Sequence, residues 1–131
     1  FVVARSFCER AEPTIAKFDE VSADDFIMDI GPSTIEEFEK SILGSKTVIW
    51  NGPMGVFEWA SFSKGTLAVA LAIAGLKSAT TVVGGGSTAE AVETFGVSDR
   101  MSHVSTGGGA SLEFMEGKEL PAVAVLPNRE N

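Results

Sequence analysis

Two glycine runs are the strongest candidates for chemistry in this sequence. Gly-Gly-Gly-Ser-Thr occupies residues 84–88, and Gly-Gly-Gly-Ala-Ser occupies residues 107–111. Because glycine lacks a side chain, an anion can approach such a turn closely, and a helix starting there offers unpaired N–H groups. The first run alone is equally compatible with a tight connection carrying a Ser or Thr helix cap. Two such runs, one strand apart, favour a cradle for a phosphoryl group in transfer.

A third segment, Asn-Gly-Pro-Met-Gly-Val-Phe-Glu at residues 51–58, mixes small and apolar residues with a single acid. Its apolar residues, Pro53 and Val56 among them, could form a flat wall for a purine. Glu58 could accept hydrogen bonds from ribose hydroxyls, as acidic residues do in other nucleotide-binding folds. An irregular loop with a surface acid explains the same residues equally well.

Short apolar or β-branched runs alternate with segments of helical periodicity. The runs predict strands at residues 2–4, 26–30, 47–50, 80–83 and 101–104. The periodic segments predict helices around residues 35–42, 67–76, 89–95 and 112–115. This alternation indicates an α/β domain with a buried, mainly parallel sheet, which binds ligands at the carboxyl edge of its strands. Four strand-to-helix junctions should gather at that edge: residues 31–34, with Ser33 or Thr34 as a helix cap, 51–58, 84–88 and 107–111.

The composition excludes several classes of function. The 131 residues are 44% hydrophobic and carry 18 acidic against 10 basic side chains, with no Lys/Arg cluster, which argues against nucleic-acid binding. The longest apolar stretch, around residues 67–76, is too short to cross a membrane. The single cysteine, Cys8, excludes an intrachain disulfide and is predicted to be buried or half-buried. The single histidine, His103, is predicted to be structural and hydrogen-bonded.

Longer motifs resemble the C-terminal third of phosphoglycerate kinases, over nearly the whole chain. In order, they are Asp-Ile-Gly-Pro at 29–32, Val-Ile-Trp-Asn-Gly-Pro-Met-Gly-Val-Phe-Glu at 48–58, Gly-Gly-Gly at 84–86, Ser-His-Val-Ser-Thr-Gly-Gly-Gly-Ala-Ser-Leu-Glu at 102–113, and Glu-Gly-Lys-Glu-Leu-Pro at 116–121. The family has two Rossmann-like α/β domains joined by a hinge. The resemblance therefore implies a Rossmann-like three-layer sandwich, incomplete on its N-terminal side. Residues 1–131 would form the C-terminal portion of the nucleotide-binding domain, with the N-terminal substrate domain absent.

The resemblance implies a glycolytic phosphotransferase that uses ATP/ADP and magnesium. The full-length enzyme moves a phosphoryl group between 1,3-bisphosphoglycerate and ADP to give 3-phosphoglycerate and ATP, and we expect it to be a cytoplasmic monomer. The carboxylic substrates would bind through the missing N-terminal domain. The implied site residues are Asn51, near the phosphates; Pro53 and Val56, lining the nucleotide pocket; Glu58, on the ribose; Gly86, Ser87 and Thr88, at the nucleotide phosphates; and the amides of Gly107, Gly108 and Gly109, facing the transferring group.

Three features depart from the family pattern. Ser87 stands where the family usually has the Asp that serves magnesium, and a hydroxyl is a much poorer magnesium ligand than a carboxylate. This argues against direct metal binding by that side chain and leaves the metal ligand unknown. Ile27 stands where the family commonly has a small residue against the adenine, so its larger side chain is expected to narrow the adenine pocket. The lysines, arginines and glycine turns of the family's earlier segments are absent.

Competing hypotheses remain open from the residues. As a piece of the kinase, the chain alone should bind nucleotide weakly and turn nothing over, and its end at 121–131, which in the family returns to the other domain, should be loose. The alternative is a free-standing, non-catalytic nucleotide-binding or interaction module, in which Ser87 and Ile27 mark relaxed chemistry. Against this alternative, the sequence begins at Phe1 inside a predicted strand, which would leave a sheet edge unpaired. A nicotinamide-dependent dehydrogenase is disfavoured because no GxGxxG turn is present.

Overall fold

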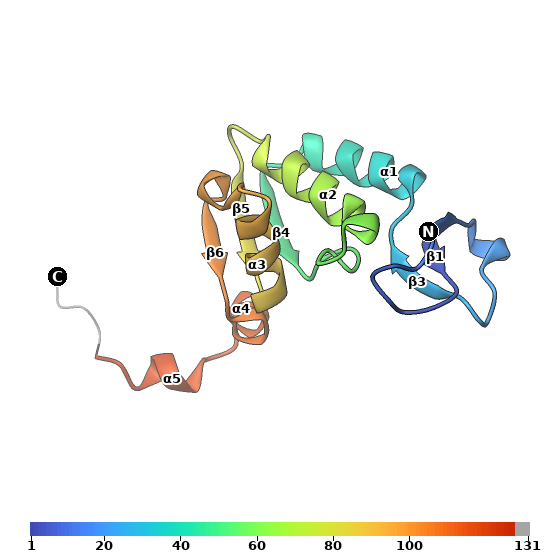
Figure 1. Cartoon of the computed structure of the whole chain (residues 1–131). Helices are drawn as coiled ribbons and strands as arrows, with labels where there is room; N and C mark the ends of the chain where they lie inside the picture. Colours follow the sequence, from blue (N-terminus) through green and yellow to red (C-terminus); the bar gives the residue numbers. More distant parts are fainter. Residues whose placement is uncertain (128–131) are drawn as a thin grey trace.

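The computed structural model describes residues 1–127, which form two small sheets connected by helices (Figure 1). The first sheet is antiparallel, in the order β2-β1-β3; its strands are β1 (Val2–Ala4), β2 (Thr14–Ile15) and β3 (Phe26–Asp29). The second sheet is parallel, in the order β4-β5-β6; its strands are β4 (Thr47–Asn51), β5 (Thr80–Gly84) and β6 (His103–Ser105).

The first four helices follow the predicted periodicity, and a short fifth was not predicted. The helices are α1 (Pro32–Leu43), α2 (Lys64–Ala74), α3 (Gly86–Thr94), α4 (Gly108–Met115) and the short α5 (Pro121–Ala124), with 3-10 turns at Phe18–Glu20, Ala60–Phe62 and Ser98–Arg100. The strand–helix alternation from β4 to α4 confirms the predicted α/β class with a parallel sheet.

One face of the parallel sheet carries the core. The strand register aligns Trp50 with Val83 and Val83 with Val104, so these side chains share a face. Trp50 and Val83 pack in one buried cluster with apolar residues of α2 and α3, among them Ile73 and Val92. The opposite face of the sheet is more open: Ile49, on this face, is 49% exposed. α4 lies against this face near the carboxyl ends of the strands. The core therefore fixes α2 and α3 against the strands whose ends carry the candidate site.

The prediction that all four strand-to-helix junctions share one sheet edge is wrong for residues 31–34. β1 and β3 pair antiparallel, with β2 on the other side of β1, and form a sheet of their own. Apolar periodicity identifies a strand but not its partner or direction, which explains the error. The junction at residues 31–34 therefore ends an antiparallel strand, and only three junctions share the carboxyl edge of the parallel sheet.

The start of α1 also differs from its predicted cap. Gly31 is the N-cap and Pro32 the first helical residue, so neither Ser33 nor Thr34 caps the helix. Proline favours this position because its fixed φ suits a helix and its missing N–H would have had no intrahelical partner.

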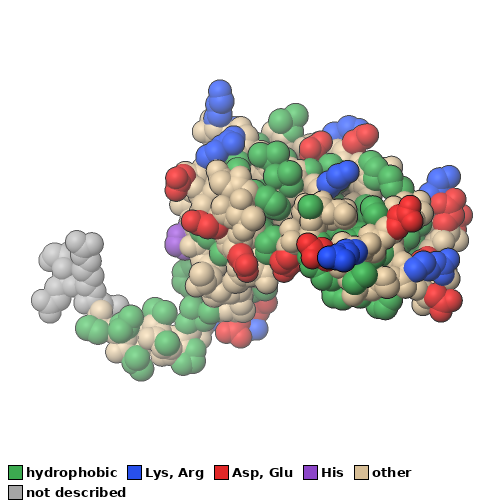
Figure 2. Space-filling view, viewed as in Figure 1, with side chains coloured by type: hydrophobic (Ala, Val, Ile, Leu, Met, Phe, Trp, Pro, Cys, Tyr) green, Lys and Arg blue, Asp and Glu red, His purple; other side chains and the backbone are tan. Residues whose placement is uncertain are grey.

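Two further residue predictions are wrong. Cys8 is exposed rather than buried, with its Sγ 3.4 Å from the Ser6 hydroxyl. His103 is exposed at the start of β6, and no side-chain hydrogen bond is found for it in the part of the chain that the structure describes. No helix among residues 1–127 is long and apolar enough to cross a membrane. On the face shown in Figure 2, acidic and basic side chains are interspersed.

The C-terminal end leaves the body of the molecule. α5 lies away from the two sheets, and hydrophobic side chains cover its surface (Figures 1 and 2). Val123, Val125 and Leu126 are all more than half exposed. α5 therefore lies clear of both sheets, and the looseness expected of residues 121–131 stays a prediction. Residues 128–131 lie outside the described part.

Candidate functional site

Three loops meet at the carboxyl edge of the parallel sheet. The register pairs Asn51 at the end of β4 with Gly84 at the end of β5, and Gly84 with Ser105 at the end of β6. α3 begins at Gly86 and α4 at Gly108, directly after β5 and β6. Parallel strands that end level bring both glycine runs and the residue 51–58 segment together, as the sequence predicted.

The first turns of α3 and α4 touch each other. A Cβ at Gly108 would lie 3.0 Å from the Gly85 Cα, which is too close for most side chains. Asn51 joins the two turns: its Nδ2 donates to the Gly108 carbonyl oxygen (3.2 Å), and its Oδ1 lies against Gly85. Gly85 itself has φ of +94°, which other residues rarely adopt. The contact therefore requires glycine at both positions and a side-chain amide from β4.

Both helix N-termini present free donors to the same space. Intrahelical bonding begins with the Ala89 N–H to the Gly85 carbonyl in α3 and with the Ser111 N–H to the Gly107 carbonyl in α4. The amides of the residues between have no acceptor within their helix. The positive ends of two helix dipoles add to these donors. Four of these residues are exposed: Gly86, Ser87, Gly109 and Ala110. The Gly107 N–H is not free, because it donates to the Ser105 hydroxyl at 3.2 Å. The arrangement suits an anionic group with several oxygens.

Comparison with known proteins identifies the family to which this chain belongs. The family model described as phosphoglycerate kinase matches residues 1–118. The chain belongs to the phosphoglycerate kinase family. It is 56% identical over 128 residues to phosphoglycerate kinase from Clostridioides difficile (strain 630) and 52% identical over 128 residues to the one from Dictyoglomus turgidum; each alignment covers 98% of this chain and 32% of the relative.

Solved structures agree with the sequence comparison. The structure of phosphoglycerate kinase from Coxiella burnetii superposes with a TM-score of 0.85 and 46% identity, covering 94% of this chain and 32% of that one. The enzyme from Pyrococcus horikoshii OT3 gives a TM-score of 0.68 and 41% identity, over 76% of this chain and 24% of that one. The chain thus spans about a third of the length of the phosphoglycerate kinases that it matches.

Two glycines of the family's turns are not required by the fold. A Cβ at Gly86 or Gly109 would meet nothing within 4 Å, and neither residue has a positive φ. Glycine inside a helix costs about 0.5–1 kcal/mol relative to alanine. Unlike Gly85 and Gly108, these two residues therefore destabilise their helices without relieving a clash. The open space beside them is available to a ligand.

Thr88 contributes to the site through its backbone. Its side chain is fully buried, and its hydroxyl accepts a hydrogen bond from the Gly52 N–H at 2.7 Å. A phosphate contact by Thr88 would therefore use its amide at the start of α3. The hydroxyl instead ties the residue 51–58 segment to that helix, a contact that the sequence did not indicate.

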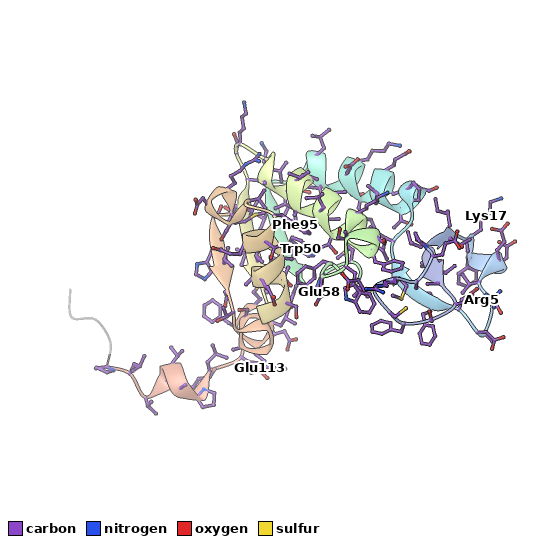
Figure 3. All side chains as sticks on the ribbon, viewed as in Figure 1. Arg5, Lys17, Trp50, Glu58, Phe95 and Glu113 are labelled. Carbon is purple, nitrogen blue, oxygen red and sulfur yellow. The ribbon has the colours of Figure 1, made fainter. Side chains whose placement is uncertain are left out.

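The predicted ribose and base contacts lie on the loop between β4 and α2. Pro53 and Val56 are half-buried and Glu58 is exposed. Figure 3 shows Glu58 on the loop between the two sheets. The Val56 N–H donates to the Met28 carbonyl at 2.9 Å, which attaches this loop to the antiparallel sheet. Ile27, next to Met28, is 56% exposed. The roles of all four residues toward a nucleotide stay predictions.

The donors at this edge do not fit a protein-bound magnesium ion. Among residues 1–127 no group of three or more His, Cys, Asp or Glu side chains could hold a metal. At the family's Asp position stands the neutral hydroxyl of Ser87. Magnesium prefers carboxylate oxygens and phosphates, so any such ion would depend on the nucleotide's own phosphates.

Two residues to which the sequence analysis assigned no role support the loop at residues 52–58. Asp29 is 2% exposed; its carboxylate accepts hydrogen bonds from the Gly65 N–H (2.7 Å) and the Ile30 N–H (2.8 Å). Thr66 is fully buried, and its hydroxyl accepts from the amides of Met54 (3.1 Å) and Gly55 (3.3 Å). An acid inside an otherwise apolar strand was the available signal for Asp29, because a buried carboxylate needs hydrogen-bond donors.

The environment of Asp29 predicts a pH effect on stability. Burial raises the pKa of this carboxyl above its ordinary value of 3.8, against the opposing effect of the two N–H donors. The folded state then holds the proton more tightly than the unfolded state, so this contribution to stability is present below pH 3.8 and is lost as pH rises through the folded-state pKa.

Asp29→Asn should remove this dependence. We expect the unfolding free energy of the wild type to fall relative to that of Asp29→Asn as the pH is raised from 3.8 into the weakly acidic range. Urea unfolding of both proteins at a series of pH values measures the difference between their unfolding free energies. The contributions of all other carboxylates cancel in this difference, because both proteins contain them. A difference that stays constant or grows in favour of the wild type would contradict the raised pKa.

Proposed function

We propose that this chain supplies the nucleotide-phosphate half of a phosphoglycerate kinase active site. In this proposal residues 1–131 are the C-terminal portion of the nucleotide-binding domain of a longer, cytoplasmic protein. That protein transfers a phosphoryl group between 1,3-bisphosphoglycerate and ADP, giving 3-phosphoglycerate and ATP. The observation that carries the proposal is the pair of touching helix N-termini, with open space at Gly86 and Gly109.

The chemistry assigns a role to each part of the site. A β-phosphate oxygen of ADP attacks the acyl phosphate, the bond from phosphorus to the carboxylate oxygen breaks, and 3-phosphoglycerate leaves as a carboxylate. The amides of Gly107, Gly108 and Gly109 stabilise the charge on the transferring group. For this, the Gly107 N–H would exchange its bond to the Ser105 hydroxyl for one to the ligand. The amides of Gly86, Ser87 and Thr88 hold the nucleotide phosphates.

The remaining assignments concern orientation of the nucleotide. Asn51 keeps the two helix starts in register and lies beside the phosphates. Pro53 and Val56 line the pocket, and Glu58 accepts from the ribose hydroxyls. 3-Phosphoglycerate would bind to the domain that this chain does not include. Catalysis is then positioning plus charge stabilisation between two domains.

Activity measurements on the whole gene product test this function. We expect ATP formation from 1,3-bisphosphoglycerate and ADP by the whole protein, and no measurable turnover by the isolated 131-residue chain. Normal turnover by the isolated chain would contradict the division of the site. Nucleotide binding without phosphoryl transfer by the whole protein would support the non-catalytic module instead.

The serine at the family's Asp position makes a separate prediction. Ser87→Asp should tighten binding of magnesium-ADP by the whole protein about tenfold, because a carboxylate there can reach the metal. Without magnesium the same variant should bind ADP more weakly than the wild type, since the new charge repels the phosphates.

Calorimetric titration with and without magnesium measures both effects, and Ser87→Asn is the uncharged control. If Ser87→Asp and Ser87→Asn behave alike in magnesium, the side chain at this position does not reach the ion.

A further inference from the structure

The loop that follows β4 is held by side chains from outside it. Residues 52–58 contain no helix or strand, yet their backbone N–H groups are anchored at several points. The Gly52 N–H donates to the Thr88 hydroxyl in the first turn of α3. The Met54 and Gly55 N–H groups both donate to the Thr66 hydroxyl in the first turn of α2. The loop is therefore hydrogen-bonded to the first turns of two helices, α2 and α3.

Thr66 places a buried hydroxyl directly beneath this loop. The residue is fully buried, and its oxygen accepts two backbone donors at once, at 3.1 and 3.3 Å. Removing this oxygen would leave two buried or half-buried N–H groups without a partner, which is costly.

Asp29 fixes the same helix start from the other side. Its carboxylate accepts from the Gly65 N–H at 2.7 Å, the position that a capping side chain would satisfy. Ser63, the actual N-cap, makes no such bond and donates its hydroxyl to the Ala60 carbonyl instead. Gly55 lies directly against the Asp29 carboxylate, with no room for a Cβ. Asp29 thus contacts both the helix start and the loop.

We propose that Thr66 and Asp29 are positioning residues that hold residues 52–58 in the shape that receives a nucleotide. The proposal deepens, and rests on, the function proposed above. Neither side chain is expected to touch the ligand, because both are buried beneath the loop. Thr66 acts through the amides of Met54 and Gly55, on either side of which lie Pro53 and Val56. Asp29 acts through the Gly65 N–H at the start of α2 and through its contact with Gly55. A loop released from these anchors samples other conformations, and binding must then select the competent one.

Thr66→Val is the direct test, because it removes the oxygen and keeps the shape. In the whole protein we expect the Kd for ADP to rise about fivefold to tenfold, with the nucleotide KM following it and kcat changing less than twofold. In the nucleotide-free protein, hydrogen exchange at the Met54 and Gly55 amides should accelerate at least tenfold. Thr66→Ser, which keeps the hydroxyl, should restore both values to within twofold. Should Thr66→Val not fold, Thr66→Ala takes its place.

Thr81→Val is a matched control. Thr81 is also buried, and its hydroxyl also accepts a backbone donor, the Ser102 N–H at 2.9 Å. It lies toward the amino end of β5, away from the loop. We expect Thr81→Val to lose stability while the Kd for ADP and the exchange at Met54 and Gly55 stay within twofold.

The outcomes separate this proposal from the proposed function. An unchanged ADP Kd together with unchanged exchange in Thr66→Val would overturn it, as would an equal weakening of ADP binding in Thr81→Val. If the wild-type whole protein binds no ADP, the proposed function fails. The exchange data alone then decide whether Thr66 holds the loop.

Discussion

Gly109→Ala should reduce the kcat of the whole protein about 100-fold while leaving its fold at least as stable as before. Gly109 lies in the first turn of α4, exposed, and an added Cβ would meet no protein atom within 4 Å. In a helix, alanine is favoured over glycine by about 0.5–1 kcal/mol. The methyl group would instead occupy the space proposed for the transferring phosphoryl group and push that group away from the amides. Loss of one well-placed donor of this kind typically lowers the rate about 10²–10³-fold.

Stability and activity should therefore change in opposite directions. Steady-state ATP formation gives kcat, and urea unfolding gives the stability. Gly44→Ala is the control, because it too would meet nothing within 4 Å but lies at the end of α1, on the loop that precedes the amino end of β4. That variant should keep full activity. An active Gly109→Ala enzyme would remove the reason for glycine at this position and with it the proposed place of phosphoryl transfer.

The sequence was sufficient for the part of the site that is built by neighbours in the chain. A strand, a glycine run and a helix follow one another twice, and parallel pairing of such units necessarily brings their helix starts to one edge. The contact of Gly85 with Gly108 and the bridging Asn51 are consequences of that register. The local order of residue types therefore predicted that the two glycine turns meet, while their role toward a phosphate stays a proposal.

What the sequence could not show depends on partners far apart in the chain. The Thr88 hydroxyl bonds to Gly52, 36 residues away, and the Asp29 carboxylate bonds to Gly65, also 36 residues away. A buried threonine or aspartate looks the same in sequence whether it caps its own helix or serves a distant loop. For the same reason the antiparallel pairing of β1 with β3 was missed, because no local pattern states a strand's direction.

Gly65→Ala should strongly destabilise the fold, although the residue lies in a helix. In a free helix the change would be favourable by up to about 1 kcal/mol. In this protein Gly65 is buried, and a Cβ would fall on the Asp29 carboxylate and on the Ile30 side chain. Overpacking of this kind lowers the unfolding free energy by about 1–3 kcal/mol. The displaced carboxylate also loses the hydrogen bond that it accepts from the Gly65 N–H. We expect a net loss of about 3 kcal/mol in unfolding free energy, measured by urea unfolding.

A double variant identifies the cause of that loss. If the clash with Asp29 is responsible, Gly65→Ala combined with Asp29→Ala should be less destabilising than the sum of the two single changes, because the second substitution clears the space that the first one needs. Gly44→Ala, which meets no neighbour, sets the baseline for glycine replacement. Strict additivity would mean that Gly65 is required by Ile30 or by the helix alone. A coupling free energy between the two sites would show instead that the Asp29 carboxylate and Gly65 pack as one unit, which attaches the antiparallel sheet to the start of α2.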